Sequence, residues 1–256
     1  MEKRKVIIHY HIFKNAGTSI DRMLKESFSE RWANYDKPEP TSKISPAELE
    51  EFILDNPDLM AVSSHHAVPP LPDKHLEVYP IILLRHPIDL AYSAYLFEWK
   101  KQRGMEQPIG SFRDYIHEKF RQPRRNAIED FQVLHLANRG YKQKNPSNSL
   151  DNEGLLNNAR KLILEAGVFG LVDRYAESLR LMRRRLHSGF PDLRIAEFHE
   201  NSLQARSSSL TDRIKAILGD LDECSRDMLV LRNQLDFRLY EYARGRFDGL
   251  LQVERP

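Results

Sequence analysis

Apolar and polar positions change their spacing at one loop near the N-terminus. Val6, Ile7 and Ile8 form a short apolar run, which is typical of a buried strand. Beyond the loop, apolar side chains recur at positions 20, 23, 24 and 28, which share one face of a helix, while positions 21, 22, 25 and 26 carry charges. The pattern therefore predicts a strand, a tight loop and an amphipathic helix in direct succession.

Strand-like and helix-like patterns alternate along most of the remaining chain. Short apolar runs predict strands at 59–63, 79–84, 168–172 and 193–198. Periodic segments predict helices at 45–56, 88–101, 111–120, 126–138 and 152–166, and an apolar row from Cys224 to Tyr242 predicts a long helix. This alternation predicts an α/β fold with a central parallel sheet, helices on both faces, and a single domain over residues 1–256.

Three residues of candidate function each follow a predicted strand. Lys14 comes after the first strand, His65 after the second and Arg85 after the third. In parallel sheets of this kind, ligands bind outside the carboxyl ends of the strands. We therefore expect the three side chains at one edge of the sheet.

The loop at positions 11–19, His-Ile-Phe-Lys-Asn-Ala-Gly-Thr-Ser, has the chemistry of a phosphate cradle. The helix that follows presents unpaired N–H groups and the positive end of a dipole, which suit an anion. Gly17 lets backbone come close, while Lys14, Thr18 and Ser19 add a charge and two hydroxyl donors. The loop lacks the Gly-Lys pair that precedes Ser or Thr in nucleoside-triphosphate loops. A tight turn with an ordinary N-cap is the alternative interpretation.

A second motif follows the apolar run at 79–84. Arg85 ends this strand, Pro87 opens the next helix, and Ser93 lies two turns into that helix. A guanidinium and a hydroxyl at these places could converge on one phosphate near the first loop. In the alternative interpretation, Arg85 pairs with a carboxylate and Ser93 faces solvent.

Together, the two motifs resemble the PAPS-dependent sulfotransferases, specifically the carbohydrate type that includes the heparan sulfate 2-O-sulfotransferases. That family usually has Pro and Thr where this chain has Phe13 and Asn15, and its second motif, Arg-x-Pro followed by Ser-x-Tyr, is shared apart from departures at His86 and Leu90. The resemblance implies a P-loop-like three-layer sandwich and PAPS (3′-phosphoadenosine-5′-phosphosulfate) as the donor, which leaves as 3′,5′-ADP. By this resemblance, Arg85 and Ser93 bind the 3′-phosphate. The full set of expected donor-binding residues is Lys14, Asn15, Ala16, Gly17, Thr18, Ser19, Arg85 and Ser93.

Sulfuryl transfer to an alcohol needs a base for the hydroxyl proton and stabilisation of charge on the departing phosphate. Lys14 is the expected catalytic cation. The resemblance implies a His base after the second strand, where His65 has an ordinary pKa of about 6.5 that leaves its ring neutral at cytoplasmic pH. Ser64 stands where the family usually has Gly, and His66 follows, so the base is His65, His66 or neither, with His65 favoured. No metal is required.

The expected acceptor is a hydroxyl-bearing molecule, either a glycan or an acidic small molecule. Arg121, Arg124 and Arg125 lie in the segment that matches the family least, where acceptor specificity is expected, and could bind an anionic group. The aromatic residues that could stack on a sugar, or belong to the core, are Tyr95, Phe97 and Trp99.

Composition limits the other possibilities. The 256 residues are 41% hydrophobic and 30% charged, which is typical of a soluble globular protein. With 39 basic and 37 acidic residues the net charge is +2, which gives no indication of nucleic-acid binding. No apolar run has the length of a membrane span or signal-peptide core, so we expect a cytoplasmic protein. The single Cys224 excludes an internal disulfide and is expected in the core.

Two other classes of protein compete with the sulfotransferase interpretation. An ATP-dependent P-loop kinase would need the missing Gly-Lys-Ser/Thr and a magnesium-binding Asp after a strand. A catalytically inactive nucleotide-binding module would be compatible with the departures from the family motifs. A metal site is not expected, because His9 and His11 share a strand face but have no evident third ligand.

Overall fold

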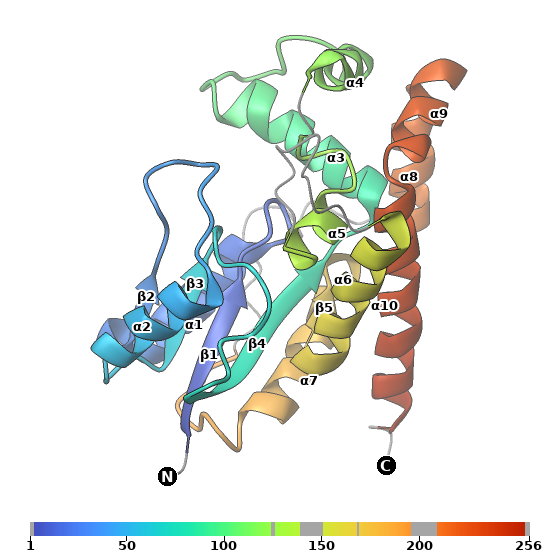
Figure 1. The fold of residues 1–256 in the computed structure, drawn as a ribbon. Helices are drawn as coiled ribbons and strands as arrows, with labels where there is room; N and C mark the ends of the chain where they lie inside the picture. The colour runs from blue at the N-terminus through green and yellow to red at the C-terminus, as the bar shows by residue number, and fades with distance from the viewer. Residues whose placement is uncertain (1–2, 124–125, 139–150, 168, 196–208, 254–256) are drawn as a thin grey trace.

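The computed structural model describes residues 3–123, 126–138, 151–167, 169–195 and 209–253. A five-stranded sheet runs through it in the order β2-β3-β1-β4-β5, and its neighbouring strands are parallel (Figure 1). The strands are β1 (Arg4–Tyr10), β2 (Trp32–Asn34), β3 (Ala61–Ser64), β4 (Leu76–Leu84) and β5 (Phe169–Leu171). The predicted central parallel sheet is confirmed.

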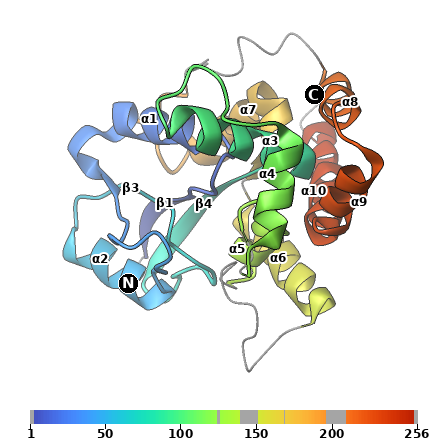
Figure 2. The ribbon, with the colours of Figure 1, turned by 90° about the horizontal axis from the view of Figure 1, so that it is seen from above.

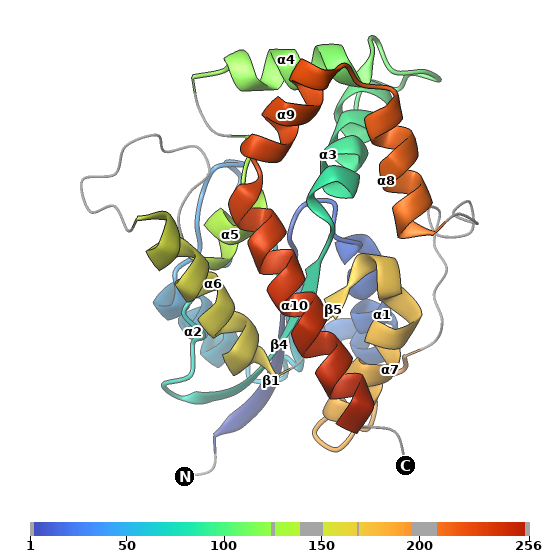
Figure 3. The same cartoon turned by 90° about the vertical axis from the view of Figure 1, so that its right-hand side faces the viewer.

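The side chains of β1 alternate between two apolar layers. Val6, Ile8 and Tyr10 pack into one buried cluster, and Ile7 packs into another. Helices on the first face are α2 (Pro46–Asp55), α5 (Phe131–Leu136), α6 (Asn152–Ala166) and α10 (Gln234–Val253), and those on the second are α1 (Gly17–Phe28) and α7 (Tyr175–Leu186). Helices therefore cover both faces, as Figures 1 and 3 show, and the three-layer α/β sandwich is confirmed.

A third group of helices lies beyond the carboxyl ends of the strands (Figures 1 and 2). It comprises α3 (Pro87–Leu96) with a π-helical turn (Phe97–Lys101), α4 (Phe112–Arg121), α8 (Leu210–Gly219) and α9 (Glu223–Leu231). These helices share an apolar cluster that contains Tyr95, Trp99 and Tyr115. Two 3-10 turns span Ser29–Arg31 and Val172–Arg174. The group stands above the sheet edge at which ligands of parallel sheets bind.

Polar caps fix where several helices begin. Ser45 and Glu48 form a capping box at the start of α2, as Ser111 and Asp114 do at the start of α4. Both helices start where the sequence predicts. Among the described residues, no helix is both long and apolar enough to cross a membrane.

The helix predicted at 126–138 is shorter than expected. Asp130 has a left-handed backbone conformation, with φ of 46°, and α5 begins only after it. The Asp130 carboxylate accepts hydrogen bonds from the N–H groups of Leu235 (2.9 Å) and Asp236 (3.1 Å), at the start of α10. Because Asp130 caps a different helix, it does not continue its own.

The long helix predicted from Cys224 is two helices, α9 and α10. Asn233, between them, is fully buried and donates to the carbonyls of Ile128 (2.8 Å) and Leu229 (2.9 Å). A polar contact with another segment thus interrupts the apolar row. Cys224 is exposed, so its predicted place in the core is wrong.

Two short segments also differ from the prediction. The segment between α1 and α2 contains β2, which the pattern did not indicate. Residues 193–195 are not part of a strand, and the rest of the strand predicted at 193–198 lies outside the described residues.

Candidate active site

The loops after β1, β3 and β4 meet at the carboxyl edge of the sheet, because these three strands are neighbours. The carbonyl of Lys14 accepts a hydrogen bond from Nη1 of Arg85 at 2.8 Å. The Nδ1 of His65 donates to the carbonyl of His11, in the same loop as Lys14, at 2.9 Å. The structure thus brings Lys14, His65 and Arg85 to one edge, as their positions after the strands predict.

The loop before α1 directs backbone N–H groups out of the helix end. Lys14 and Ala16 adopt left-handed conformations (φ 61° and 60°). Helix α1 begins at Gly17, and Ala16 provides no side-chain cap, so the ordinary N-cap of the alternative interpretation is absent. Thr18 is exposed at this end, and Ser19 is buried. Uncapped N–H groups at the start of a helix suit an anion.

The side chains of Asn15 and Lys14 connect the loop to other elements. Asn15 is 1% exposed, and its Nδ2 donates to the carbonyl of Leu83 (2.7 Å) and to Oε1 of Gln132 (2.8 Å). The Asn15 side chain therefore anchors the loop to β4 and α5. The Lys14 ammonium lies 4.5 Å from the centre of the Phe97 ring, a cation–π contact with the π-helical turn.

Arg85 is 4% exposed and is partly committed to protein groups. Its Nε donates to Oδ2 of Asp89 at 2.8 Å, and its Nη1 to Lys14. The predicted alternative, a carboxylate pair, is therefore present. Its Nη2 is buried and has no hydrogen-bond partner among the described residues, which leaves a donor that fits an anion. Ser93 is half-buried on α3, and its sharing of a phosphate with Arg85 stays a prediction.

Gln132, which the sequence did not indicate, connects the loop at Lys14 to the motif at Arg85. Its Oε1 accepts from the N–H of Arg85 (2.9 Å) and from Nδ2 of Asn15 (2.8 Å), and its Nε2 donates to the carbonyl of Arg85 (2.9 Å). Gln132 is 1% exposed, so these bonds are shielded from water. The loop at Lys14 and the motif at Arg85 form one connected structure.

Asp236 of α10 supports this network from behind. Its carboxylate accepts from the backbone N–H groups of Gln132 (3.1 Å) and Val133 (2.8 Å) in the first turn of α5. Burial raises the pKa of Asp236 to about 6. Helices α5 and α10 therefore cap each other, since Asp130 caps α10 in return.

The neighbouring histidines His65 and His66 differ in the ring nitrogen that each uses. Nδ1 of His65 faces the carbonyl of His11, which can only accept, so Nδ1 carries the proton of the neutral ring and Nε2 keeps its lone pair. Nδ1 of His66 accepts from the backbone N–H of Lys37 at 3.0 Å, which places the ring proton on Nε2. The free lone pair of the neutral ring is therefore on Nε2 in His65, whereas in His66 the lone pair is on Nδ1 and is already used by the Lys37 N–H.

Asp36 holds the turn that carries His65. Its Oδ1 accepts from the N–H of His65 (2.7 Å) and from the hydroxyl of Ser64 (3.0 Å). The Ser64 oxygen in turn accepts from the N–H groups of His66 (3.0 Å) and Ala67 (2.9 Å). Although His65 is exposed, partial loss of water around its ring, and then the neighbouring His11, lower its pKa, so the ring is neutral at neutral pH.

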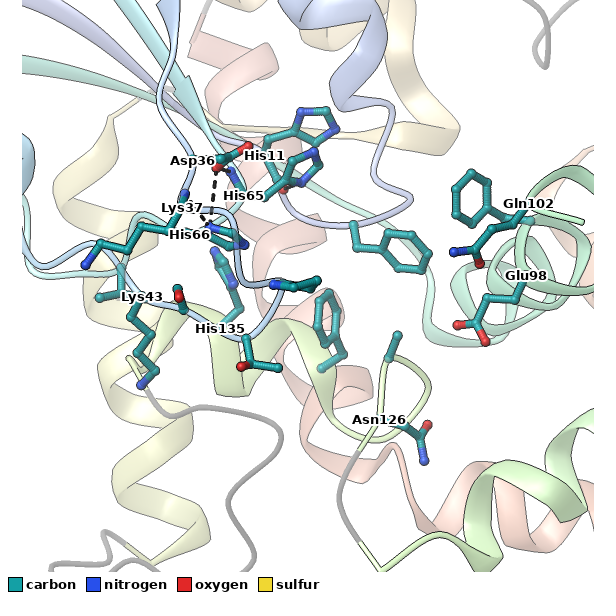
Figure 4. A pocket seen from close by; sticks show the side chains of 18 of the residues that line it. His11, Asp36, Lys37, Lys43, His65, His66, Glu98, Gln102, Asn126 and His135 are labelled. Carbon is teal, nitrogen blue, oxygen red and sulfur yellow. Dashed lines mark hydrogen bonds and ion pairs between the residues drawn. The ribbon is translucent and has the colours of Figure 1, made fainter.

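A cavity of about 820 Å³ lies beside His65. Figure 4 shows His65, His66 and His135 on one side of it and Glu98 and Gln102 on the other. Burial lowers the pKa of His135 to about 4, so this imidazole is also neutral. The volume is that of a small-molecule site.

The cavity has aromatic walls and largely compensated charges. Its aromatic rings come from Phe13, Phe97 and Phe131. Among the lysines that line it, Lys37 pairs with Glu48 at 2.5 Å and Lys119 pairs with Glu98.

The predicted acceptor residues are divided by the structure. Phe97 lines the cavity. Tyr95 and Trp99 instead pack in the apolar cluster of the third helix group, so for these two residues the alternative prediction, a place in the core, holds. Arg121 lines a different cavity, of about 440 Å³, at α4. Arg124 and Arg125 lie outside the described residues.

The structure supplies a third group next to His9 and His11. Oδ1 of Asp21, on α1, accepts from Nδ1 of His9 at 2.8 Å, and its Oδ2 lies 2.8 Å from Nδ1 of His11, an ion-pair distance. Burial opposes ionisation of Asp21, but hydrogen bonding from His11 and His9 outweighs it and holds the pKa of the carboxyl well below its usual range. We describe this as a hydrogen-bonded cluster, and the absence of a metal requirement stays a prediction.

The fold is a three-layer α/β sandwich that carries, at one sheet edge, a helix start without a side-chain cap and a buried arginine. The chain matches the sulfotransferase family over residues 1–243 and belongs to that family. It is also 26% identical, over 254 residues, to an uncharacterized protein from Archaeoglobus fulgidus, a match that covers 93% of this chain and 95% of that protein. The predicted family is confirmed, and the likeness to the heparan sulfate enzymes in particular stays a prediction.

Proposed function

We propose that this sulfotransferase moves the sulfuryl group of PAPS to a hydroxyl of a carbohydrate or related small molecule, with His65 as the general base. The observation that carries the proposal is the state of His65. Its ring is neutral, its Nε2 keeps the lone pair, and it lies beside a cavity and next to the loop at positions 11–19. Membership of the family supports sulfuryl transfer in general.

The donor side of the site has groups for both phosphates of PAPS, which supplies the activated sulfuryl group when bound. The N–H groups of Ala16, Gly17 and Thr18 and the hydroxyl groups of Thr18 and Ser19 are the proposed donors to the 5′-phosphate. The N–H groups of Asn15 and Ser19 donate instead to the carbonyls of Ile12 and Ala16, both at 3.1 Å, and so shape the loop. The unpartnered Nη2 of Arg85 fits the 3′-phosphate, with Ser93 as a second donor. Lys14 neutralises charge on the departing phosphate.

The proposed reaction moves one proton and one sulfuryl group. As the acceptor oxygen attacks sulfur, its proton passes to Nε2 of His65, and the bond from sulfur to the 5′-phosphate oxygen breaks with its electron pair on that oxygen. His65 keeps its Nδ1 proton on the carbonyl of His11 throughout. The products are a sulfate ester, 3′,5′-ADP and a proton on His65, which solvent then removes.

The acceptor in this proposal occupies the 820 Å³ cavity. Phe13, Phe97 and Phe131 offer faces for a sugar ring, and Gln102 offers an amide for hydroxyl groups. A glycan or an acidic small molecule is the acceptor class. We also propose that residues 1–256 form a single domain and that the protein acts in the cytoplasm.

Calorimetric titration of the purified protein tests the donor class. We expect 3′,5′-ADP to bind more tightly than ATP in the absence of magnesium, because Arg85 and Ser93 address a phosphate that ATP lacks. Tighter, magnesium-dependent binding of ATP would instead favour a P-loop kinase. Tight 3′,5′-ADP binding without turnover of labelled PAPS, over a panel of glycans and alcohols, would favour an inactive nucleotide-binding module.

A further inference from the structure

His65 rests on a second histidine. The ring centres of His11 and His65 lie 3.7 Å apart, with 35° between the ring planes. The backbone carbonyl of His11 also accepts the Nδ1 proton of His65. His11 therefore contacts His65 twice, through its ring and through its backbone.

His11 is itself fixed on two sides. Its Nδ1 lies 2.8 Å from Oδ2 of Asp21, whose other oxygen is held by His9. On the remaining side it packs against the start of α1 so closely that a Cβ on Gly17 would lie 2.0 Å from its Cδ2. Glycine at position 17 thus makes room for the His11 ring as well as for a ligand. The side chain of His11 is 10% exposed, so its ring is tightly enclosed and cannot turn freely.

We propose that Asp21 and His11 are positioning residues for His65, which set the plane of its ring and direct the Nε2 lone pair into the cavity. The inference rests on the proposed role of His65 as base. Asp21 lies at ion-pair distance from Nδ1 of His11, the His11 ring supports the His65 ring, and the His11 carbonyl fixes the tautomer of His65. Neither Asp21 nor His11 exchanges a proton with the acceptor.

Charge in this cluster also affects the proton affinity of His65. His11 lowers the pKa of His65, whereas Asp36 and Asp21 raise it. His9 faces His11 from β1, and His135 of α5, with His66 and Lys43 near it, faces His65 across the cavity wall. Loss of the His11 ring and loss of the Asp21 charge should therefore shift the titration of His65 in opposite directions.

A matched pair of variants tests the proposal. His11→Asn keeps an N–H donor near the position of Nδ1 and removes the ring that supports His65. His9→Asn makes the same change on the other side of the Asp21 carboxylate, away from His65. The readouts are turnover with PAPS, affinity for 3′,5′-ADP, and the tautomer and pKa of His65 from nitrogen and carbon NMR of histidine-labelled protein.

We expect wild-type His65 to show the Nδ1–H tautomer. His11→Asn should lower turnover by about 10- to 100-fold, the loss typical of a misplaced catalytic group, while 3′,5′-ADP affinity is kept. It should also raise the pKa of His65, because water regains access and a repelling neighbour is lost. His9→Asn should leave the His65 titration as in the wild type and retain turnover.

Asp21→Asn is the second variant, in case His11→Asn does not fold. The two imidazoles contact different oxygens of the Asp21 carboxylate, and one of these oxygens becomes an NH2 group in the amide. One contact is therefore lost and turnover should again fall, but the pKa of His65 should decrease because a negative charge is lost. Equal losses in His9→Asn and His11→Asn with an unchanged His65 titration would overturn the proposal, as would activity lost to a chelator and regained with zinc. If the variants change the pKa of His65 as expected but do not change turnover, Asp21 and His11 position His65 but His65 is not the base.

Discussion

The two sides of the site that we propose for the donor and for the acceptor are built in different ways. On the donor side, Asn15, Arg85 and Gln132 are 1%, 4% and 1% exposed and bond to one another and to backbone. On the acceptor side, His65 is exposed, and Lys37 is half-buried and paired with a glutamate. A buried polar network holds its members in place, whereas exposed side chains can be replaced without disturbing the sheet.

This difference separates two kinds of consequence. Substitutions on the donor side should change folding stability and nucleotide affinity together, because the same hydrogen bonds serve both. Substitutions of exposed side chains on the acceptor side, such as His65, should change turnover while the fold and the proposed nucleotide site remain intact.

The largest expected effect is on turnover, at the acceptor side. His65→Ala should lower turnover by about 10²- to 10⁴-fold, the usual contribution of a general base, because the acceptor proton loses its destination. Affinity for 3′,5′-ADP should stay at the wild-type value. His66→Ala should have a smaller effect, since Nδ1 of His66 is occupied by the Lys37 N–H. Steady-state kinetics measures turnover in both variants. A larger loss of turnover in His66→Ala than in His65→Ala would make His66 the base, and near-normal turnover in both variants would place the base elsewhere.

On the donor side, Gln132→Leu should reduce the free energy of unfolding by about 3 kcal/mol or more. It removes the partner of the Arg85 backbone and of the Asn15 amide, and each buried group left without a partner costs about 1–3 kcal/mol. Urea denaturation measures the loss. The control is Gln122→Leu, an exposed glutamine at the cavity, which should change stability by less than about 0.5 kcal/mol. Similar losses in both variants would contradict the contrast between the two sides.

Arg85→Ala should weaken binding of 3′,5′-ADP by roughly tenfold to a hundredfold, since a charge-assisted hydrogen bond contributes about 1.5–3 kcal/mol. Binding of 5′-AMP, which lacks the 3′-phosphate, should weaken far less. Because both nucleotides are measured on the same variant, any general damage from the loss of the Arg85–Asp89 ion pair affects both affinities and does not alter the comparison. Equal losses for both nucleotides, measured by calorimetry, would assign Arg85 a structural role only.

The smallest expected effect is a displacement of the pH profile. Because the pKa of His65 is lowered, the acidic limb of turnover should have its midpoint below about 6.5, the ordinary value for histidine. Turnover should fall as the pH decreases through this midpoint, since protonation fills the Nε2 lone pair. A profile of turnover against pH checks this, and an acidic limb that persists unchanged in any residual activity of His65→Ala would assign it to another group.

Local patterns predicted the parts of the molecule that depend on neighbours in sequence. The apolar runs of β1, β3 and β4 and the loops that follow them came from contiguous residues, and parallel strand order then placed Lys14, His65 and Arg85 together. The break at Asn233 was not predictable, because a buried contact with Ile128, 105 positions away, outweighs the helical period.

The missed residues of the site depend on distant contacts. Gln132 is 47 positions from Arg85 and 117 from Asn15, and in the sequence it is one polar residue in a helical pattern. His65 and His66 could not be separated by sequence, because the tautomer of His65 is set by a carbonyl 54 positions away and that of His66 by an N–H 29 positions away. In the sequence, Asp21 is one of the charged positions outside the apolar face of the predicted helix, whereas in the structure it faces His9 and His11.

The most direct test of the proposed activity is incubation of the purified protein with sulfur-labelled PAPS and a panel of glycans and small alcohols. Separation of the products shows where the label goes. We predict a labelled sulfate ester on at least one hydroxyl acceptor, with an equal amount of 3′,5′-ADP. The contradicting result is label that stays on PAPS with every acceptor while the terminal phosphate of ATP is transferred under the same conditions.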